Sequence, residues 1–165
     1  MTSDEILSEL RTMSSEKYKA NVVKLGIPEA CSIGVSTADV RKLAKRRART
    51  MHLAHELWNT GYHEARLLAV LVIDKKKFTL QEGEAFMHDV ISWDLCDHLC
   101  KNLLVKLKGY EDLIEKWCDA EAVYVKRAAY TLMASAAIHE KNPESETLDH
   151  YLSLIRTYSM MRESM

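Results

Sequence analysis

Glycine and proline are scarce in this chain, with five and two among 165 residues. Few points along the chain therefore force a turn. No segment alternates apolar and polar residues with the period of two that a half-buried strand requires. Apolar residues instead recur at helical spacing along nearly the whole chain. The predicted fold class is therefore all-α.

The chain also has few cysteines, almost no net charge and no long apolar run. The four cysteines lack the spacing of a disulfide framework or a CxxC metal pair, and no secretory signal opens the chain, so we expect reduced thiols inside the cell. Apolar runs are far shorter than the roughly 20 residues of a membrane span, so no membrane partner is expected. A net charge of −1 excludes the class of polycationic proteins that bind nucleic acid through their total charge, so any such binding must come from local positive patches.

Helix caps and breaks divide the chain into successive helices. We expect a first helix capped by Ser3, a second that follows Ser15 and stops near Gly26, and a loop over 28–35. Asn142 and Pro143 predict a break before the last helix. The other expected helices span 37–48, 51–59, 62–74, 79–90, 92–108, 110–118, 121–140 and 145–158.

Pairs of these helices recur about every 30 residues, which indicates an array of helical repeats. The predicted architecture is a right-handed, HEAT-like solenoid of antiparallel helix pairs, forming one domain over 1–165. Arg66 and Asp97 are 31 residues apart, and Asp97 and Arg127 are 30 apart, so all three share one phase of the second helix in successive repeats. They predict a charged ridge on the face that commonly binds ligands in solenoids, with a structural ladder of ion pairs as the alternative.

The densest charge feature lies in the expected helix 37–48 and just beyond it. Six cations fall within nine residues, and they form either a solvated face or a surface that contacts phosphate: Arg41, Lys42, Lys45, Arg46, Arg47 and Arg49.

The segment 92–100 carries the strongest candidate for chemistry. Ser92 is the expected N-cap, and Trp93 and Asp97 are separated by four positions, so they share one helix face. An aromatic ring beside a carboxylate suits the stabilisation of a developing cation, whereas the alternative is a core Trp beside a solvated Asp. Cys96 and Cys100 fall short of the four convergent ligands that zinc usually takes, so neither metal nor cofactor is expected.

Three segments carry a resemblance to a known family. Residues 33–43 resemble the pattern Gly-Val-x-x-Pro-x-x-Arg-x-Leu, with Ala38 at the Pro position. Residues 92–97 resemble Ser-Trp-Trp-Asp-x-x-Asp without the first Trp, and 123–129 resemble Trp-x-x-Arg-Ala-Ala with Tyr124 at the Trp position. In this order and spacing the chain resembles the AlkD-like DNA alkylation repair enzymes, which are alkylpurine DNA glycosylases built from HEAT-like repeats.

The resemblance implies hydrolysis of the N-glycosidic bond of cationic N3- or N7-alkylated purines in duplex DNA. By position, Asp97 matches the catalytic carboxylate and Trp93 the aromatic residue that packs at the lesion. Arg127, with Lys126 beside it, matches the cation that holds the DNA backbone. The further candidates for DNA binding are Arg66, Lys45 and Arg46.

Members of the family continue with another repeat that carries a further Trp, and Met165 falls where that repeat would begin. We therefore expect a domain cut short at its C-terminus, with an open end that pairs two copies as a homodimer. A repeat protein that binds DNA without excising bases, and a protein scaffold, remain alternatives. The expected location is cytoplasmic, with nucleoid association if the source is bacterial.

Overall fold

The computed structural model describes residues 2–139 and 146–163, with side chains as far as Thr157. Within these ranges the regular structure is helical and no strand forms, which confirms the predicted all-α class. The predicted break at 142–143 lies outside the described residues. The helices are α1 Ser3–Thr12, α2 Glu16–Lys24, η1 Glu29–Cys31, α3 Thr37–Lys45, α4 Met51–Asn59, α5 His63–Val72, α6 Leu80–His88, α7 Trp93–Asn102, η2 Leu104–Lys106, α8 Glu111–Trp117, α9 Val123–His139 and α10 Glu146–Glu163.

Side-chain caps begin most of these helices. Thr2, rather than the predicted Ser3, caps α1: its hydroxyl accepts the Glu5 N–H, and the Glu5 carboxylate accepts the Thr2 N–H. The shift by one residue follows from this reciprocal capping box, which satisfies two backbone donors at once. The same kind of cap hydroxyl accepts a backbone N–H at Ser15, Ser36, Thr50, Thr79 and Ser92.

The prediction of one helix over 92–108 is wrong. Helix α7 ends at Asn102, whose Nδ2 donates to the His98 carbonyl at 3.0 Å, and a short 3₁₀ segment follows. Leu103 leaves the α region of the backbone (φ −130°, ψ −61°), and the N–H groups of Lys106 and Leu107 then bond carbonyls three residues back instead of four. Helix α3 likewise ends at Lys45 instead of residue 48, because Thr50 already caps the next helix.

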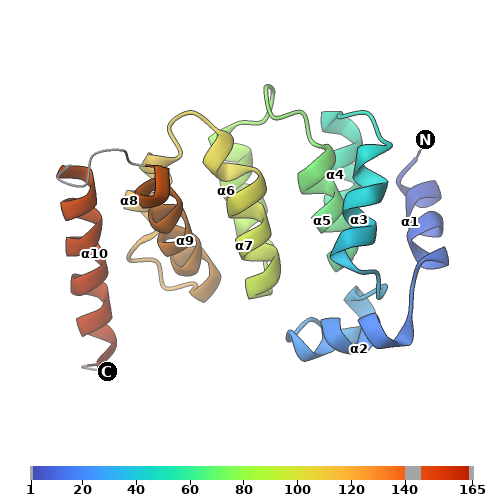
Figure 1. Ribbon diagram of the computed structural model, residues 1–165, viewed down its shortest axis with the longest axis horizontal. Helices are drawn as coiled ribbons and strands as arrows, with labels where there is room; N and C mark the ends of the chain where they lie inside the picture. The colour runs from blue at the N-terminus through green and yellow to red at the C-terminus, as the bar shows by residue number, and fades with distance from the viewer. Residues whose placement is uncertain (1, 140–145, 164–165) are drawn as a thin grey trace.

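Four helices form a row that runs through the array. Helices α3, α5, α7 and α9, hereafter the inner row, pack side by side in that order, while α4 packs on α5 and α8 on α9. Figure 1 shows the helices strung along the long axis from α1 to α10, with α2 lying across one end. Contacts within the row join residues one repeat apart, at 31 positions for His63 and Asp94 and at 30 for Arg127 and Asp97. These contacts agree with the predicted period. Because they join equivalent positions of neighbouring helices, the helices of the row run in the same direction.

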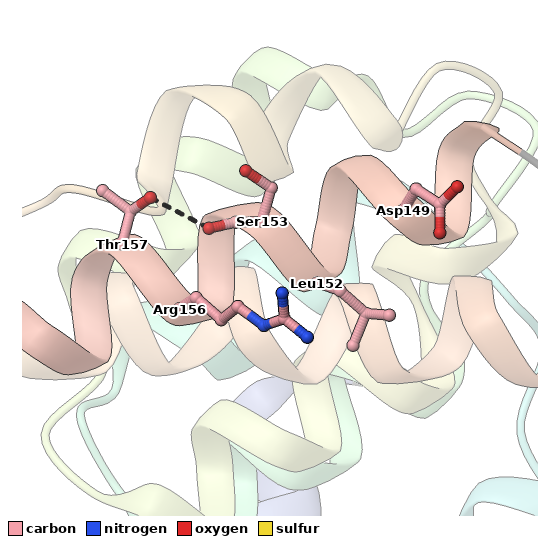
Figure 2. Close-up of a pocket in the computed structure, with 5 residues that line it drawn as sticks. All are labelled: Asp149, Leu152, Ser153, Arg156 and Thr157. Carbon is pink, nitrogen blue, oxygen red and sulfur yellow. Dashed lines mark hydrogen bonds between the residues drawn. The ribbon is translucent and has the colours of Figure 1, made fainter.

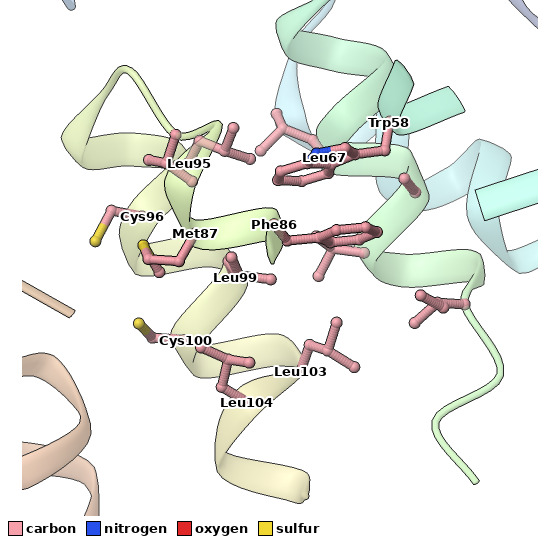
Figure 3. Packing of buried hydrophobic residues seen from close by; sticks show 14 of the residues in the cluster. Trp58, Leu67, Phe86, Met87, Leu95, Cys96, Leu99, Cys100, Leu103 and Leu104 are labelled. Atoms are coloured by element: carbon pink, nitrogen blue, oxygen red, sulfur yellow. The ribbon is translucent and has the colours of Figure 1, made fainter. Parts of the chain in front are cut away.

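The core beneath the row is built around Trp58 of α4 and Phe86 of α6. Their rings stack with centroids 4.1 Å apart and planes inclined by 5° (Figure 3). Leu95 and Leu99 of α7 are fully buried in the same cluster, which leaves the opposite face of α7, with Trp93, open to solvent. Among the described residues, no helix is both long and apolar enough to cross a membrane.

Candidate nucleic-acid interface

Trp93, Asp97 and Arg127 meet at the surface where α7 and α9 pack together. The guanidinium of Arg127 donates to both oxygens of Asp97, from Nε to Oδ1 at 2.9 Å and from Nη2 to Oδ2 at 2.8 Å. Its central carbon lies 5.6 Å from the centroid of the Trp93 ring. The sequence predicted all three residues, and the structure brings them together as one unit, hereafter the Trp93–Asp97–Arg127 site.

The three side chains of this site differ in exposure. Trp93 is 43% exposed, and the side chain of Arg127 is 44% exposed, whereas that of Asp97 is only 19% exposed. The hydroxyl of Thr131, one helical turn beyond Arg127, also donates to Asp97 Oδ1 at 3.5 Å. The carboxylate is thus held in one orientation, and its hydrogen bond raises the pKa of Arg127. A flat aromatic face and a cation remain accessible to a ligand.

Arg66 does not join this site, although it has the phase that the repeat predicts. Its Nε donates to the Trp58 carbonyl at 3.0 Å and its Nη1 to the Asp89 carbonyl at 3.1 Å. The guanidinium also lies over the Trp58 ring, 5.1 Å from the centroid. Arg66 therefore ties α5 to the ends of α4 and α6, and the predicted continuous ridge of three charges is wrong at this position. The ion-pair ladder also fails here, because in the described part of the chain Arg66 forms no ion pair or hydrogen bond with Asp97.

The other predicted DNA contacts occupy different surroundings. Lys45, the last residue of α3, is exposed, whereas the Arg46 guanidinium pairs with Glu9 of α1 at 3.2 Å. Arg47 pairs with the same carboxylate. The end of α3 is therefore joined to α1 by two arginines, of which Arg46 is still exposed, and Lys45 also faces solvent. Lys126 is half-buried in the first turn of α9.

Buried polar contacts fix the N-terminal ends of the inner row. The carboxylate of Glu64 accepts the N–H groups of Ile33 and Gly34, at 2.8–3.0 Å. His63, 4% exposed, lies 3.2 Å from an oxygen of Asp94, and this hydrogen bond lowers the pKa of Asp94. Sequence reasoning missed both contacts. Their common separation of about 31 positions was the available signal, because it equals the repeat period.

The sequence matches the family described as "DNA alkylation repair enzyme" over residues 6–163. The chain belongs to this family.

Among solved structures, this family member is similar to one described as "A new family of proteins related to the HEAT-like repeat DNA glycosylases with affinity for branched DNA structures". The TM-score is 0.84 and the sequence identity 21%, and the match covers 95% of this chain and 67% of that one. No curated protein matches the sequence. The structural likeness shows that the chain has the HEAT-like helical fold.

Two other features of this family member were considered as sites. Within the described residues, no group of three or more His, Cys, Asp or Glu side chains is placed to hold a metal ion. The Cys100 thiol has its pKa raised by its contact with Cys96 and by burial, so it stays protonated at neutral pH. A hollow on α10 is lined by residues of that one helix alone, so no second element supplies converging groups (Figure 2): Asp149, Leu152, Ser153, Arg156 and Thr157.

Proposed function

We propose that this chain binds duplex DNA and hydrolyses the N-glycosidic bond of cationic N3- or N7-alkylated purines. One observation carries the proposal: Trp93, Asp97 and Arg127 converge at the surface with the carboxylate in a fixed orientation. Each of the three also stands at a position of the motifs by which the chain resembles alkylpurine glycosylases. Membership of the DNA alkylation repair family supports the same substrate class.

The glycosidic bond of an alkylated purine breaks with little catalytic assistance, because the base already carries a positive charge. As the bond between C1′ and the purine nitrogen breaks, its electron pair neutralises the alkylated base and leaves an oxocarbenium-like sugar. Glycoside hydrolysis usually recruits a second carboxyl group to protonate the leaving group, but here one carboxylate suffices. Asp97 stabilises the sugar cation and accepts a proton from the water that bonds to C1′. Trp93 offers its ring face to the same cationic centre.

Arg127 has two tasks in this proposal. It holds the Asp97 carboxylate before DNA arrives, and its 44% exposed side chain can turn part of its donor set to a backbone phosphate. Lys126, on the same turn of α9, adds a second positive charge beside it. We propose Lys45, exposed at the end of α3, as a more distant backbone contact.

Base release from duplex DNA that carries N7-methylguanine tests the proposal. The rate is measured with protein in excess, for the parent chain and for Asp97→Asn. We expect release above the spontaneous rate from the parent and a loss of about a hundredfold or more in the variant, the scale of a lost electrostatic or acid–base contribution.

Glu84→Gln is the matched control for this experiment. Glu84 of α6 and Lys116 of α8 also form an ion pair between successive repeats, with Nζ 2.7 Å from the carboxylate, but on the first helices of the pairs. Removing that carboxylate leaves the Trp93–Asp97–Arg127 site intact, so release should stay at the parent rate. Equal release by the parent and Asp97→Asn would rule out Asp97 as the catalytic carboxylate.

A second candidate function is DNA binding without excision. It is favoured by the similar structure, whose description names affinity for branched DNA, and by the engagement of both Asp97 oxygens with Arg127. Absence of base release from every alkylated duplex, together with tight binding to a four-way junction, would establish this alternative. Failure of both assays would favour the protein scaffold.

We also propose a second copy of the chain as partner of the α9–α10 end. Ile138 is 80% exposed there, Leu152 53% and Ile155 38%, so apolar side chains face solvent on two neighbouring helices. Light scattering on the eluting protein tests this. A dimer that Leu152→Arg converts to a monomer supports the proposal, and a monomeric parent at high concentration contradicts it.

A further inference from the structure

Three cations from successive repeats gather at the C-terminal ends of the inner row. Arg49 follows α3, Lys75 follows α5, and Lys106 ends the 3₁₀ segment after α7. The Thr50 N–H donates to the Val72 carbonyl at 3.0 Å, which holds the segment bearing Arg49 against the end of α5. The parallel row thus brings together three side chains, hereafter the Arg49–Lys75–Lys106 cluster, that are distant in sequence.

The cluster has positive charge without a carboxylate to balance it. Lys75 is half-buried, and its pKa is lowered by burial first, then by the positive charges of Lys106 and Arg49. Among the described residues, none of the three forms an ion pair within 4.0 Å. The nearest acid in sequence, Asp74, lies 4.0 Å from Lys77 instead.

Helix ends explain only part of this arrangement. Cations are favoured near the C-terminus of a helix by its dipole, which accounts for positive residues at this edge. The dipole does not account for a half-buried lysine, Lys75, that lies near two further positive charges, those of Lys106 and Arg49. Charge held together without a partner is typical of a site that takes a ligand of opposite charge.

The repeat period indicates the shape of that ligand. Lys45, Lys75 and Lys106 are separated by 30 and 31 residues, so each repeat supplies one lysine at the same edge of the row. Neighbouring helix axes lie about 8–10 Å apart, so the lysines form a line on the order of 20 Å long. A line of that length suits a polyanion with regularly spaced charges better than a single small anion.

We propose that the Arg49–Lys75–Lys106 cluster binds backbone phosphates of nucleic acid, as a second contact beyond the Trp93–Asp97–Arg127 site. The inference rests on the proposed DNA-binding function and extends it. At 1.5 Å per residue along α7, the cluster lies on the order of 10 Å from Asp97. Phosphates bound there would fix the register of the duplex on the row, while the first site contacts the lesion.

The test compares two double variants with equal loss of charge. Lys75→Gln/Lys106→Gln removes the two lysines of the cluster, and Lys76→Gln/Lys77→Gln removes two exposed lysines of the loop that bears Lys75. Binding of a fluorescent, unmodified duplex is measured by anisotropy over a range of salt concentrations. We expect the cluster variant to bind about tenfold or more weakly and to lose about two units of the log–log salt slope, against a much smaller change in the control.

Equal changes in both double variants would overturn the site, because net charge alone would then explain binding. Titration with inorganic phosphate, followed by NMR of the lysine side chains, separates the two sources of the ligand. Shifts of Lys75 and Lys106 caused by inorganic phosphate but not by the duplex would overturn the assignment to nucleic acid.

Thermal unfolding gives a reading that is independent of any ligand. Lys75→Gln should raise the unfolding temperature, since it relieves repulsion from Lys106 and Arg49, whereas a lowered temperature would contradict the gathering of these three charges. If the parent releases no base but the cluster and control variants still differ in salt slope, the glycosylase proposal fails and the phosphate site stands. If the parent releases base but the two variants have the same salt slope, the phosphate site fails and the glycosylase proposal stands.

Discussion

Arg127 holds Asp97 by two parallel hydrogen bonds, from Nε at 2.9 Å and from Nη2 at 2.8 Å, across the packing of α9 on α7. The planar guanidinium fits the carboxylate in this way, and its carbon also lies 5.6 Å from the centroid of the Trp93 ring. One cation therefore orients the proposed catalytic carboxylate and packs near the aromatic side chain. The three residues act as one unit, and a change in Arg127 should affect all of them.

Replacement of Arg127 by lysine tests this unit without changing its charge. A lysine donates from a single point and cannot bond both carboxylate oxygens in the same fork geometry, so base release should fall by about tenfold or more. The free energy of unfolding should change by less than about 1 kcal/mol, because exposed ion pairs contribute little. Single-turnover base release and urea unfolding measure the two effects. An Arg127→Lys variant as fast as the parent would show that charge alone suffices.

Replacement by alanine should lower stability at Trp58 and DNA binding at Trp93. Trp58 is 1% exposed, stacks on Phe86 and donates its indole N–H to Asp89 at 2.8 Å. Trp58→Ala should therefore lower the free energy of unfolding by about 3–5 kcal/mol. Trp93 is 43% exposed, so Trp93→Ala should cost less than about 1 kcal/mol of stability.

The same Trp93→Ala variant should weaken binding to an alkylated duplex by about 1–3 kcal/mol, the scale of one lost aromatic contact with a nucleotide. Denaturant unfolding and anisotropy separate the two residues. A Trp93→Ala variant that binds as tightly as the parent, or unfolds as readily as Trp58→Ala, would contradict its assignment to the interface.

Glu64→Gln should destabilise the N-terminal end of the inner row. The Glu64 carboxylate is fully buried and accepts the N–H groups of Ile33 and Gly34. Oε2 accepts both N–H groups and Oε1 accepts that of Ile33 as well, so a Gln amide would place its NH₂ group against the Ile33 N–H. We therefore expect a loss of about 2–3 kcal/mol in unfolding free energy. Glu121→Gln, at an exposed position, should change stability by less than about 0.5 kcal/mol and serves as the control.

Stability should fall as the pH is lowered through the range in which His98 gains a proton only in the unfolded chain. Burial lowers the pKa of His98 from 6.5 to about 4, and Nε2 bonds the Leu67 carbonyl at 3.1 Å while Nδ1 faces the Asn102 amide. The ring is therefore neutral, with its proton on Nε2.

Because the unfolded chain binds the proton more readily, the stabilisation is complete above about pH 6.5 and is lost progressively toward pH 4. The loss attributable to His98 should reach about 3 kcal/mol at most. Urea unfolding across this range measures it, and His98→Gln provides the comparison. A variant with the same pH slope as the parent would assign the effect to other groups.

Much of the fold was predictable from the sequence. Helix positions depend on residues within one or two turns: apolar spacing gave the all-α class, and hydroxyl caps such as Ser36, Thr79 and Ser92 marked the beginnings of helices. The repeat period followed from similar segments 30 or 31 residues apart, and it correctly brought Asp97 and Arg127 together. The end of α7 was predicted wrongly, because Leu103 leaves the α region of the backbone and a 3₁₀ segment follows without a glycine or proline to mark it.

The tertiary structure alone determined which charged groups meet. Arg66 has the phase of Asp97 and Arg127, yet its guanidinium bonds two carbonyls and lies over Trp58, because α4 and α6 place the Trp58 and Asp89 carbonyls within its reach. Lys75 and Lys106 belong to no motif in the sequence, and the stacking of parallel helices brings their charges near one another. The physical reason is range: caps and apolar periodicity act within a few residues, whereas ion pairs and clusters of like charge depend on how whole repeats pack.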